Sequence, residues 1–248
     1  MNIFVPKSYS ELTPAQTRWL FRMIIRNPEM NTIELKTIAF LRLSNIRVIT
    51  RDHETGDFLI KFGRTIIRID AEQIAGATRH LDWILFPPDT PWRPERIAWR
   101  RPTEADFSEI TFRTFITIDN LYQGYLQTED ISLLLQIARQ LVPRPRRPFR
   151  KWELLAIFKW VESVKDFFAR KFPDFFQPLG ESDSLSGKPA LPTRKQLEDA
   201  MNAQIRALTK GDITREEEIL DMPCWRALIE LDAQAREYLE LKRQTAKS

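Results

Sequence analysis

Apolar residues between positions 13 and 43 recur at helical spacing and predict two helices. The first is expected to begin after Thr13, because Thr13 and Gln16 match a capping box and Pro14 suits the first helical position. It is expected to end at Asn27, which precedes a proline. The second is predicted to run from about residue 31 or 32 to residue 43.

The hydrophobic pattern then changes to a period of two. Strands are predicted over residues 46–50, 58–62 and 64–69, and turn-forming residues occupy positions 52–57. These segments predict a small antiparallel sheet. A further helix is expected to follow the sheet, from Asp70 to Leu85.

The middle of the chain alternates between proline-rich and helical stretches. Residues 86–106 are rich in proline and predict an extended arm, and residues 107–142 read as helical with a break near Gly124. Residues 143–148 form a stiff, basic, proline-rich spacer. The longest helix is predicted over residues 152–172.

Glycine, serine and proline are concentrated in residues 177–192, which predict a flexible linker. Capping boxes at Thr193 and Thr214, a glycine at position 211 and a third helix from about Asp221 then predict a helical C-terminal appendage. The expected fold is α+β and mostly helical. The expected organisation is a body (1–176) that contains the sheet (46–69), a linker (177–192) and an appendage (193–248).

Composition excludes the common phosphate-binding loops. The seven glycines of the 248 residues never place three within six positions, as a dinucleotide-binding turn requires. Gly187 and Lys188 form the only Gly-Lys pair, but a P-loop needs a second glycine where this chain has Ser182. We therefore expect no nucleotide cofactor, and nothing in the pattern predicts another cofactor.

The chain carries 38 lysine and arginine residues against 34 aspartate and glutamate residues, a modest net charge of +4. It has a single cysteine, which is typical of a reducing compartment. The N-terminus lacks the apolar core of a signal peptide, and no apolar run is long enough to span a membrane. We expect a cytoplasmic protein that does not enter a membrane.

Candidate catalytic residues are few. His53 and His80 lie too far apart in sequence to predict a metal site, and Cys224 falls on an apolar helix face, which favours packing over nucleophilic chemistry. The acidic residues at positions 212, 216–218 and 221 could hold a metal for phosphoryl transfer. Their place in the first turn of a helix favours a structural role, because the helix dipole stabilises negative charge there.

Basic side chains gather in two segments and provide a candidate nucleic-acid interface. Arginines interleaved with aromatic residues can bind a phosphate backbone, although a basic segment can also be merely solvated or pair with an acidic protein surface. The candidate residues are Arg93, Arg96, Arg100, Arg101, Arg144, Arg146, Arg147, Arg150 and Lys151.

Aromatic side chains crowd the stretch from residue 152 to residue 176. They are too numerous for one helix face, so some are expected in the core and the surplus at a protein interface, where aromatic residues are enriched. The candidate protein-binding residues are Trp152, Trp160, Phe167, Phe168, Phe172, Phe175 and Phe176.

Several segments together resemble uncharacterised proteins encoded in bacterial prophages and related mobile elements. They are YSELTPAQ at 9–16, ITF at 110–112, DNLYQGY at 119–125, KFPDFF at 171–176, MNAQIRALTKGD at 201–212 and CWRAL at 224–228. The ending of the chain, which is predicted as a helix, Gly-Asp, an acidic turn and a charged helix, also resembles phage tail-assembly chaperones. This second resemblance implies a protein that coats the tape-measure protein while the tail tube polymerises. Neither resemblance implies a catalytic residue.

The sequence thus favours a non-enzymatic phage-type assembly or adaptor protein in the cytoplasm of a bacterial host. Its expected partners are other proteins, including phage structural proteins. The alternative is a DNA-binding accessory protein that uses the basic segments 93–101 and 144–151. An enzyme with a dispersed carboxylate site is a third hypothesis.

Overall fold

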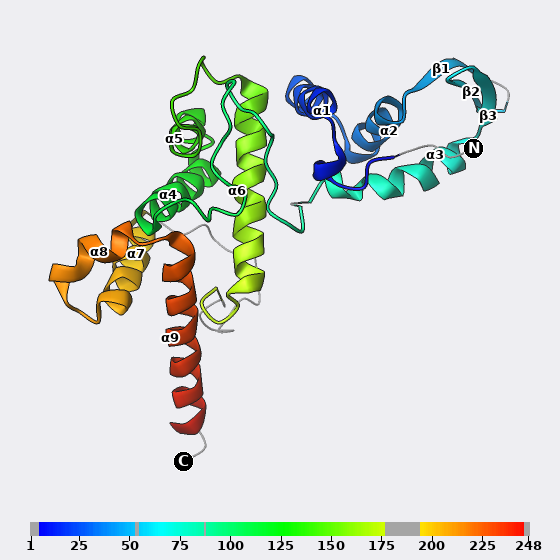
Figure 1. Ribbon diagram of the computed structural model, residues 1–248. Coiled ribbons are helices and arrows are strands. Elements are labelled where there is room, and N and C mark those ends of the chain that lie inside the picture. The colour runs from blue at the N-terminus through cyan, green and yellow to red at the C-terminus, as the bar shows by residue number, and fades with distance from the viewer. Residues whose placement is uncertain (1–4, 53–54, 87, 177–193, 246–248) are drawn as a thin grey trace. The chain divides into compact units, whose positions relative to one another are not determined.

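A computed structural model describes residues 5–52, 55–86, 88–176 and 194–245. The chain forms two compact units, residues 1–88 with 151–156 and residues 89–150 with 157–248 (Figure 1). The fold is α+β and mostly helical with one small antiparallel sheet, as predicted. The predicted linker (177–192) lies outside the described residues. The sequence predicts a body (1–176) and an appendage (193–248). In the structure the helices of the appendage belong to the second unit together with residues 89–150, so the boundary between the units differs from the predicted one.

The first unit begins with two capped helices, and the cap of the first is the one that the sequence predicts. α1 (Pro14–Arg26) follows Thr13, whose hydroxyl oxygen accepts a hydrogen bond from the Gln16 N–H at 3.3 Å, while the Gln16 side chain accepts one from the Thr13 N–H at 2.9 Å. α2 (Thr32–Leu43) follows Asn31, whose side chain accepts a hydrogen bond from the Glu34 N–H. Leu20, Phe21 and Phe40 of these helices are buried.

The predicted sheet forms in the order β1-β2-β3. Antiparallel strands β1 (Ile46–Arg51), β2 (Phe58–Phe62) and β3 (Thr65–Ile69) place Ile60 opposite both Val48 and Ile67. Ile60 is 1% exposed and anchors the apolar face.

The helix predicted from Asp70 to Leu85 divides into two parts. α3 (Ala71–Thr78) has the capping box of Asp70 and Gln73, and a 3₁₀ segment (Arg79–Ile84) continues it. Residues three apart share one side of a 3₁₀ helix. The tighter winding therefore buries Leu81 and Ile84 together, at 0% and 2% exposure.

The second unit contains α4 (Phe112–Thr128), α5 (Ile131–Leu141) and most of α6 (Lys151–Lys171). The break predicted near Gly124 comes later in the chain: Gly124 lies inside α4, and the chain turns at Glu129, which has a φ of 55°. A β-carbon at Gly124 would lie 3.2 Å from the Leu133 side chain. The glycine therefore allows α4 and α5 to approach closely rather than ending a helix.

The C-terminal helices are α7 (Arg194–Thr209), α8 (Glu216–Asp221) and α9 (Cys224–Thr245), with a 3₁₀ turn (Ile213–Arg215) before α8. Gly211, at a φ of +84°, follows α7 as predicted. The predicted capping box of Thr214 and Glu217 is wrong, because Thr214 instead donates from its N–H to the Asp212 carboxylate at 3.0 Å. The capping box expected at Thr193 lies outside the described residues.

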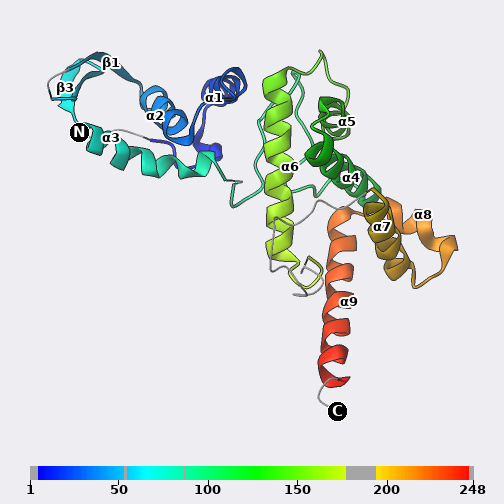
Figure 2. The ribbon, with the colours of Figure 1, turned by 180° about the vertical axis from the view of Figure 1, so that it is seen from behind.

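These helices dock on α4. The Cys224 N–H donates to the Ile110 carbonyl oxygen at 3.0 Å, and the Phe112 N–H donates to the Met222 carbonyl oxygen at 2.9 Å. The Trp225 indole N–H donates to the Asp106 carbonyl oxygen at 2.8 Å. In Figure 1 and in the view from behind in Figure 2, the C-terminal half of α9 extends beyond α7 and α8. Among the described helices, none has the length and apolar character needed to cross a membrane.

Candidate functional site

A two-residue turn carries the centre of the candidate site. The Ile97 N–H donates to the Arg100 carbonyl oxygen and the Arg100 N–H donates to the Ile97 carbonyl oxygen, both at 2.9 Å. The residues between them, Ala98 and Trp99, have φ angles of 47° and 63°. Two consecutive positive φ angles are what a type I′ turn requires, and Asn-Gly is the sequence that adopts it most easily. Non-glycine residues in this conformation cost on the order of 1 kcal/mol or more each.

Hydrogen bonds join this turn to the basic spacer. The Arg146 N–H donates to the Ala98 carbonyl oxygen at 3.2 Å, and Arg100 Nε donates to the Arg144 carbonyl oxygen at 2.9 Å. Nearby, the Thr103 N–H donates to the Leu141 carbonyl oxygen at 2.9 Å. The two basic segments predicted as a nucleic-acid interface therefore meet within the second unit.

Where they meet, the surface has a hollow of about 470 Å³, here called the arginine hollow. Five arginines, one glutamate and one tryptophan line it. They are Arg93, Arg96, Arg100, Arg101, Arg146, Glu95 and Trp99. The positive charges outnumber the single carboxylate in the lining, so the hollow suits an anion.

The arginines differ in how their charge is compensated. Glu104 pairs with two of them, with Arg101 at 2.7 Å and with Arg93 at 3.4 Å. Within the described part of the chain, Arg96 and Arg146 are exposed and pair with no carboxylate. Arg100 donates its Nε–H to a backbone carbonyl oxygen, which leaves its positive charge uncompensated. These three guanidinium groups supply the free positive charge of the hollow.

Arg93 is largely enclosed. Its side chain is 10% exposed, and its Nε is buried without a hydrogen-bond partner among the described residues. One terminal nitrogen donates to the Pro94 carbonyl oxygen at 3.4 Å. A guanidinium group held in this way is fixed in position, so it loses little conformational entropy when it binds an anion.

Trp99 lines the hollow although its side chain is large and apolar. It is 62% exposed, and the Arg147 guanidinium carbon lies 5.5 Å from the ring centroid, in cation–π contact. Sequence reasoning placed Trp99 in the extended arm but not among the site residues. The available signal was its position directly before two arginines, Arg100 and Arg101.

The remaining basic candidates lie around the hollow or apart from it. Arg144 is exposed at a φ of 49° and contributes the carbonyl oxygen that Arg100 binds. Arg150 is exposed at the end of the spacer, and Lys151 begins α6 in the part of the chain that groups with the first unit. Neither lines the hollow.

The aromatic candidates are mostly core residues, which corrects the predicted surface. Trp160 and Phe168 are 0% exposed, Phe172 is 3% exposed, and Trp152 of the first unit is 8% exposed. The Trp160 indole N–H donates to the Ala105 carbonyl oxygen at 2.7 Å. Burial of these four side chains removes most of the apolar surface from which a protein interface was predicted.

Three aromatic candidates are half-buried: Phe167, Phe175 and Phe176. Phe167 lies 5.9 Å from the Trp225 ring, and the rings of Phe175 and Phe176 lie 4.8 Å apart. The Phe175 N–H donates to the Asp232 carboxylate at 3.0 Å. These residues join the end of α6 to α9 instead of forming a continuous exposed patch.

The other candidate groups have structural surroundings. Cys224 is fully buried, and burial raises the pKa of its thiol. Arg113 pairs with the carboxylates of Glu217 and Asp221, and hydrogen bonds from Thr214 lower the pKa of Asp212. In the described residues, no three histidine, cysteine or acidic side chains are placed to hold a metal ion. His80 is exposed, and His53 lies outside the described residues.

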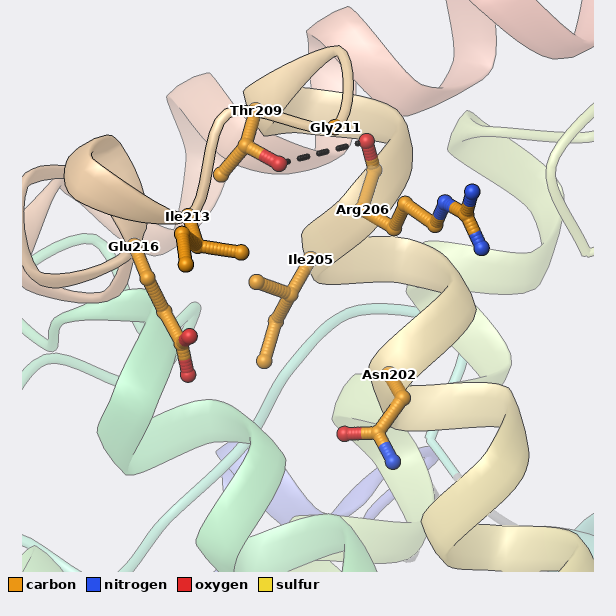
Figure 3. Close-up of a pocket in the computed structure, with 7 residues that line it drawn as sticks. All are labelled: Asn202, Ile205, Arg206, Thr209, Gly211, Ile213 and Glu216. Carbon is orange, nitrogen blue, oxygen red and sulfur yellow. Dashed lines mark hydrogen bonds between the residues drawn. The ribbon is translucent and has the colours of Figure 1, made fainter.

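A second hollow of about 340 Å³ lies between α7 and α8 (Figure 3). Ile205, Ile213 and Glu216 gather on one side of it, and Arg206 points to the other. The Thr209 hydroxyl donates to the Arg206 carbonyl oxygen at 3.3 Å. This hollow has one positive and one negative side chain, so it lacks the excess charge of the arginine hollow.

No family model, curated protein or solved structure matches this chain. The resemblance to prophage proteins and to tail-assembly chaperones stays a prediction. The arginine hollow is the strongest functional feature of the described residues.

Proposed function

We propose that this protein binds nucleic acid through the arginine hollow. The observation that carries the proposal is the convergence of Arg96, Arg100 and Arg146, from two segments far apart in sequence, around one hollow without a matching set of carboxylates. Guanidinium groups donate paired hydrogen bonds to phosphate oxygens and keep their charge at any physiological pH. A backbone of repeated phosphates suits several such groups held close together.

The structural context favours a phosphate polymer over an acidic protein surface. The hollow is concave and includes an exposed tryptophan beside its arginines. Aromatic rings next to basic side chains are typical of nucleic-acid sites, because bases offer π faces that carboxylate side chains lack. We therefore favour nucleic acid, and the test includes an acidic polymer as the competing partner.

The test measures binding of fluorescent DNA and RNA oligonucleotides, single-stranded and duplex, over a range of salt concentrations. A variant with Arg96→Ser and Arg146→Ser is compared with a control variant that carries Arg79→Ser and Arg243→Ser. Both pairs are exposed arginines, but the control pair lies outside the hollow. The site variant should bind more weakly. The slope of log K against log salt concentration should become less steep by about 0.7 to 0.9 for each lost phosphate contact. The control should bind like the wild type.

Two outcomes would overturn the proposal. One is absence of binding to every oligonucleotide at low salt. The other is equal binding of polyglutamate with the same dependence on Arg96 and Arg146, which would identify an acidic protein as the partner.

A second candidate function is the phage-type assembly or adaptor role implied by the resemblance. The observation that favours it is the exposed apolar surface of α9, where Tyr238 is 63% exposed and Leu241 is 62% exposed, whereas Leu231 on the docked part of the helix is 4% exposed. Apolar side chains that recur along an exposed helix suit a helical protein partner. A tape-measure protein would be such a partner in the cytoplasm of a bacterial host.

Co-expression tests this second function. The chain should keep a phage tape-measure protein soluble, and a variant with Tyr238→Lys and Leu241→Lys should not. Replacing two exposed neutral residues of α9, Ala233→Lys and Thr245→Lys, serves as the control because it adds the same positive charge. If both variants keep the tape-measure protein equally soluble, α9 is not the binding surface.

A further inference from the structure

The turn that carries Trp99 has an unfavourable sequence for its conformation. Ala98 and Trp99 occupy two positions with positive φ, where Asn-Gly or Asp-Gly would be relaxed. Departures from local sequence preference of this kind concentrate at functional sites, where the strained residue has another role. The turn places a tryptophan at the point where a smaller residue would fit the backbone better.

The position of the ring indicates what that role is. Trp99 lines the arginine hollow, and its side chain is 62% exposed. The Arg147 guanidinium group lies next to the ring, with its central carbon 5.5 Å from the ring centroid. The ring is thus held next to guanidinium groups while most of its surface stays open to solvent.

The hollow also has a suitable size. Its volume of about 470 Å³ is within the range of sites that enclose a small organic group. Such a hollow can take one nucleotide, with a base against Trp99 and the adjoining phosphates on Arg96, Arg100 and Arg146. In a duplex the faces of the bases are covered by their neighbours, so only an unpaired base can stack on a protein ring.

We infer that the arginine hollow binds single-stranded nucleic acid, with one unpaired base stacked on Trp99. This inference rests on the proposed function, because the same arginines hold the phosphates. Stacking on Trp99 distinguishes single strands from duplexes. The arginines alone do not, since they contact only the backbone. Single-stranded DNA and RNA share the required chemistry, and separate arms of the test distinguish them.

The test compares an oligothymidylate with an abasic strand of the same length, which has the phosphates but no bases. The wild type should prefer the oligothymidylate by about tenfold, the scale of one stacked base. Trp99→Leu, which keeps an apolar side chain without a π face, should lose this preference. Trp99→Phe should retain most of it. An oligouridylate arm shows whether RNA binds as well as DNA.

A turn variant separates stacking from folding. Trp99→Gly supplies glycine at a position of positive φ and leaves the buried Ala98 unchanged, so its thermal stability should equal or exceed that of the wild type. It should bind the abasic strand like the wild type and show no preference for the oligothymidylate. Loss of preference in a protein that is at least as stable cannot result from unfolding.

The outcomes of this test are distinguishable from failure of the proposed function. Equal binding of both strands by the wild type, with no effect of Trp99→Leu, would overturn the stacking inference and leave backbone binding by the arginines intact. Tighter binding of duplex than of single strands would also overturn it. Absence of binding to any strand would overturn the proposed function itself.

Discussion

Arg100 Nε donates a hydrogen bond of 2.9 Å to the backbone carbonyl oxygen of Arg144. This bond joins two basic segments that are 44 residues apart in the chain. It also orients the Arg100 guanidinium group, because the Nε–H is committed to the backbone and the terminal nitrogens stay available. Binding of an anion in the arginine hollow should therefore depend on the orientation that this hydrogen bond gives Arg100, as well as on the number of positive charges.

Replacing Arg100 with lysine tests this dependence on geometry. Arg100→Lys keeps the charge but removes the planar guanidinium fork, and its single ammonium group cannot both bind the Arg144 carbonyl oxygen and present paired donors to a phosphate. We expect oligonucleotide affinity to fall several-fold. The measurement is a titration by fluorescence anisotropy, with Arg79→Lys as the control. If Arg100→Lys binds like the wild type, charge alone determines affinity.

Trp160 should be a major contributor to stability, in contrast to Trp99. Trp160 is 0% exposed and donates its indole N–H to the Ala105 carbonyl oxygen, whereas Trp99 is 62% exposed. Trp160→Phe should lower the free energy of unfolding by about 1–3 kcal/mol, because the part-buried Ala105 carbonyl oxygen loses its hydrogen-bond partner. Trp99→Phe should change it little. Urea denaturation measures both, and similar values for the two variants would contradict the assignment of Trp160 to the core.

Stability should decrease at alkaline pH. Burial raises the pKa of the Cys224 thiol, and burial followed by the charges of Glu162 and Asp119 raises the pKa of Tyr122. Above about pH 8.5 for cysteine and about pH 10 for tyrosine, the unfolded chain releases protons that the folded chain retains. The free energy of unfolding therefore falls as pH rises, by at most about 1.4 kcal/mol per pH unit for each group.

Cys224→Ala isolates the thiol contribution. In this variant, unfolding followed between about pH 8.5 and pH 10 should depend less on pH than in the wild type. The variant itself should lose on the order of 1 kcal/mol at neutral pH through weaker packing. An unchanged pH dependence would show that the thiol does not ionise differently in the folded and unfolded chains.

Glu129→Gly should stabilise the connection between α4 and α5. Glu129 is exposed at a φ of 55°, a conformation that glycine adopts without the steric cost of a β-carbon. The expected gain is about 1 kcal/mol or less, seen as a higher midpoint of thermal unfolding. Glu237→Gly is the matched control: this exposed glutamate lies inside α9, where glycine should cost about 1 kcal/mol. Equal shifts for both variants would contradict the left-handed assignment at Glu129.

Local sequence patterns determined most elements of the fold. The capping box of Thr13 and Gln16, the alternation that gives the three strands, and Gly211 after α7 each act within a few residues of chain. Such signals depend on local hydrogen bonds and side-chain periodicity, which the sequence states directly. The break predicted near Gly124 lies at Glu129 instead, because Gly124 allows a close approach of Leu133 inside the helix rather than ending it.

Only the tertiary structure decided which candidate residues form a surface. The aromatic residues around Trp160 and Phe168 are numerous enough in sequence to suggest an interface, but packing of Phe107 and Trp225 against them places them in the core. Conversely, the arginines of the arm and of the spacer lie in segments without periodicity, so nothing local predicts that they meet. Long-range hydrogen bonds, from Arg146 to Ala98 and from Arg100 to Arg144, bring them together. Burial and convergence depend on residues distant in sequence, and for that reason the sequence alone named the arginines without assembling them into a site.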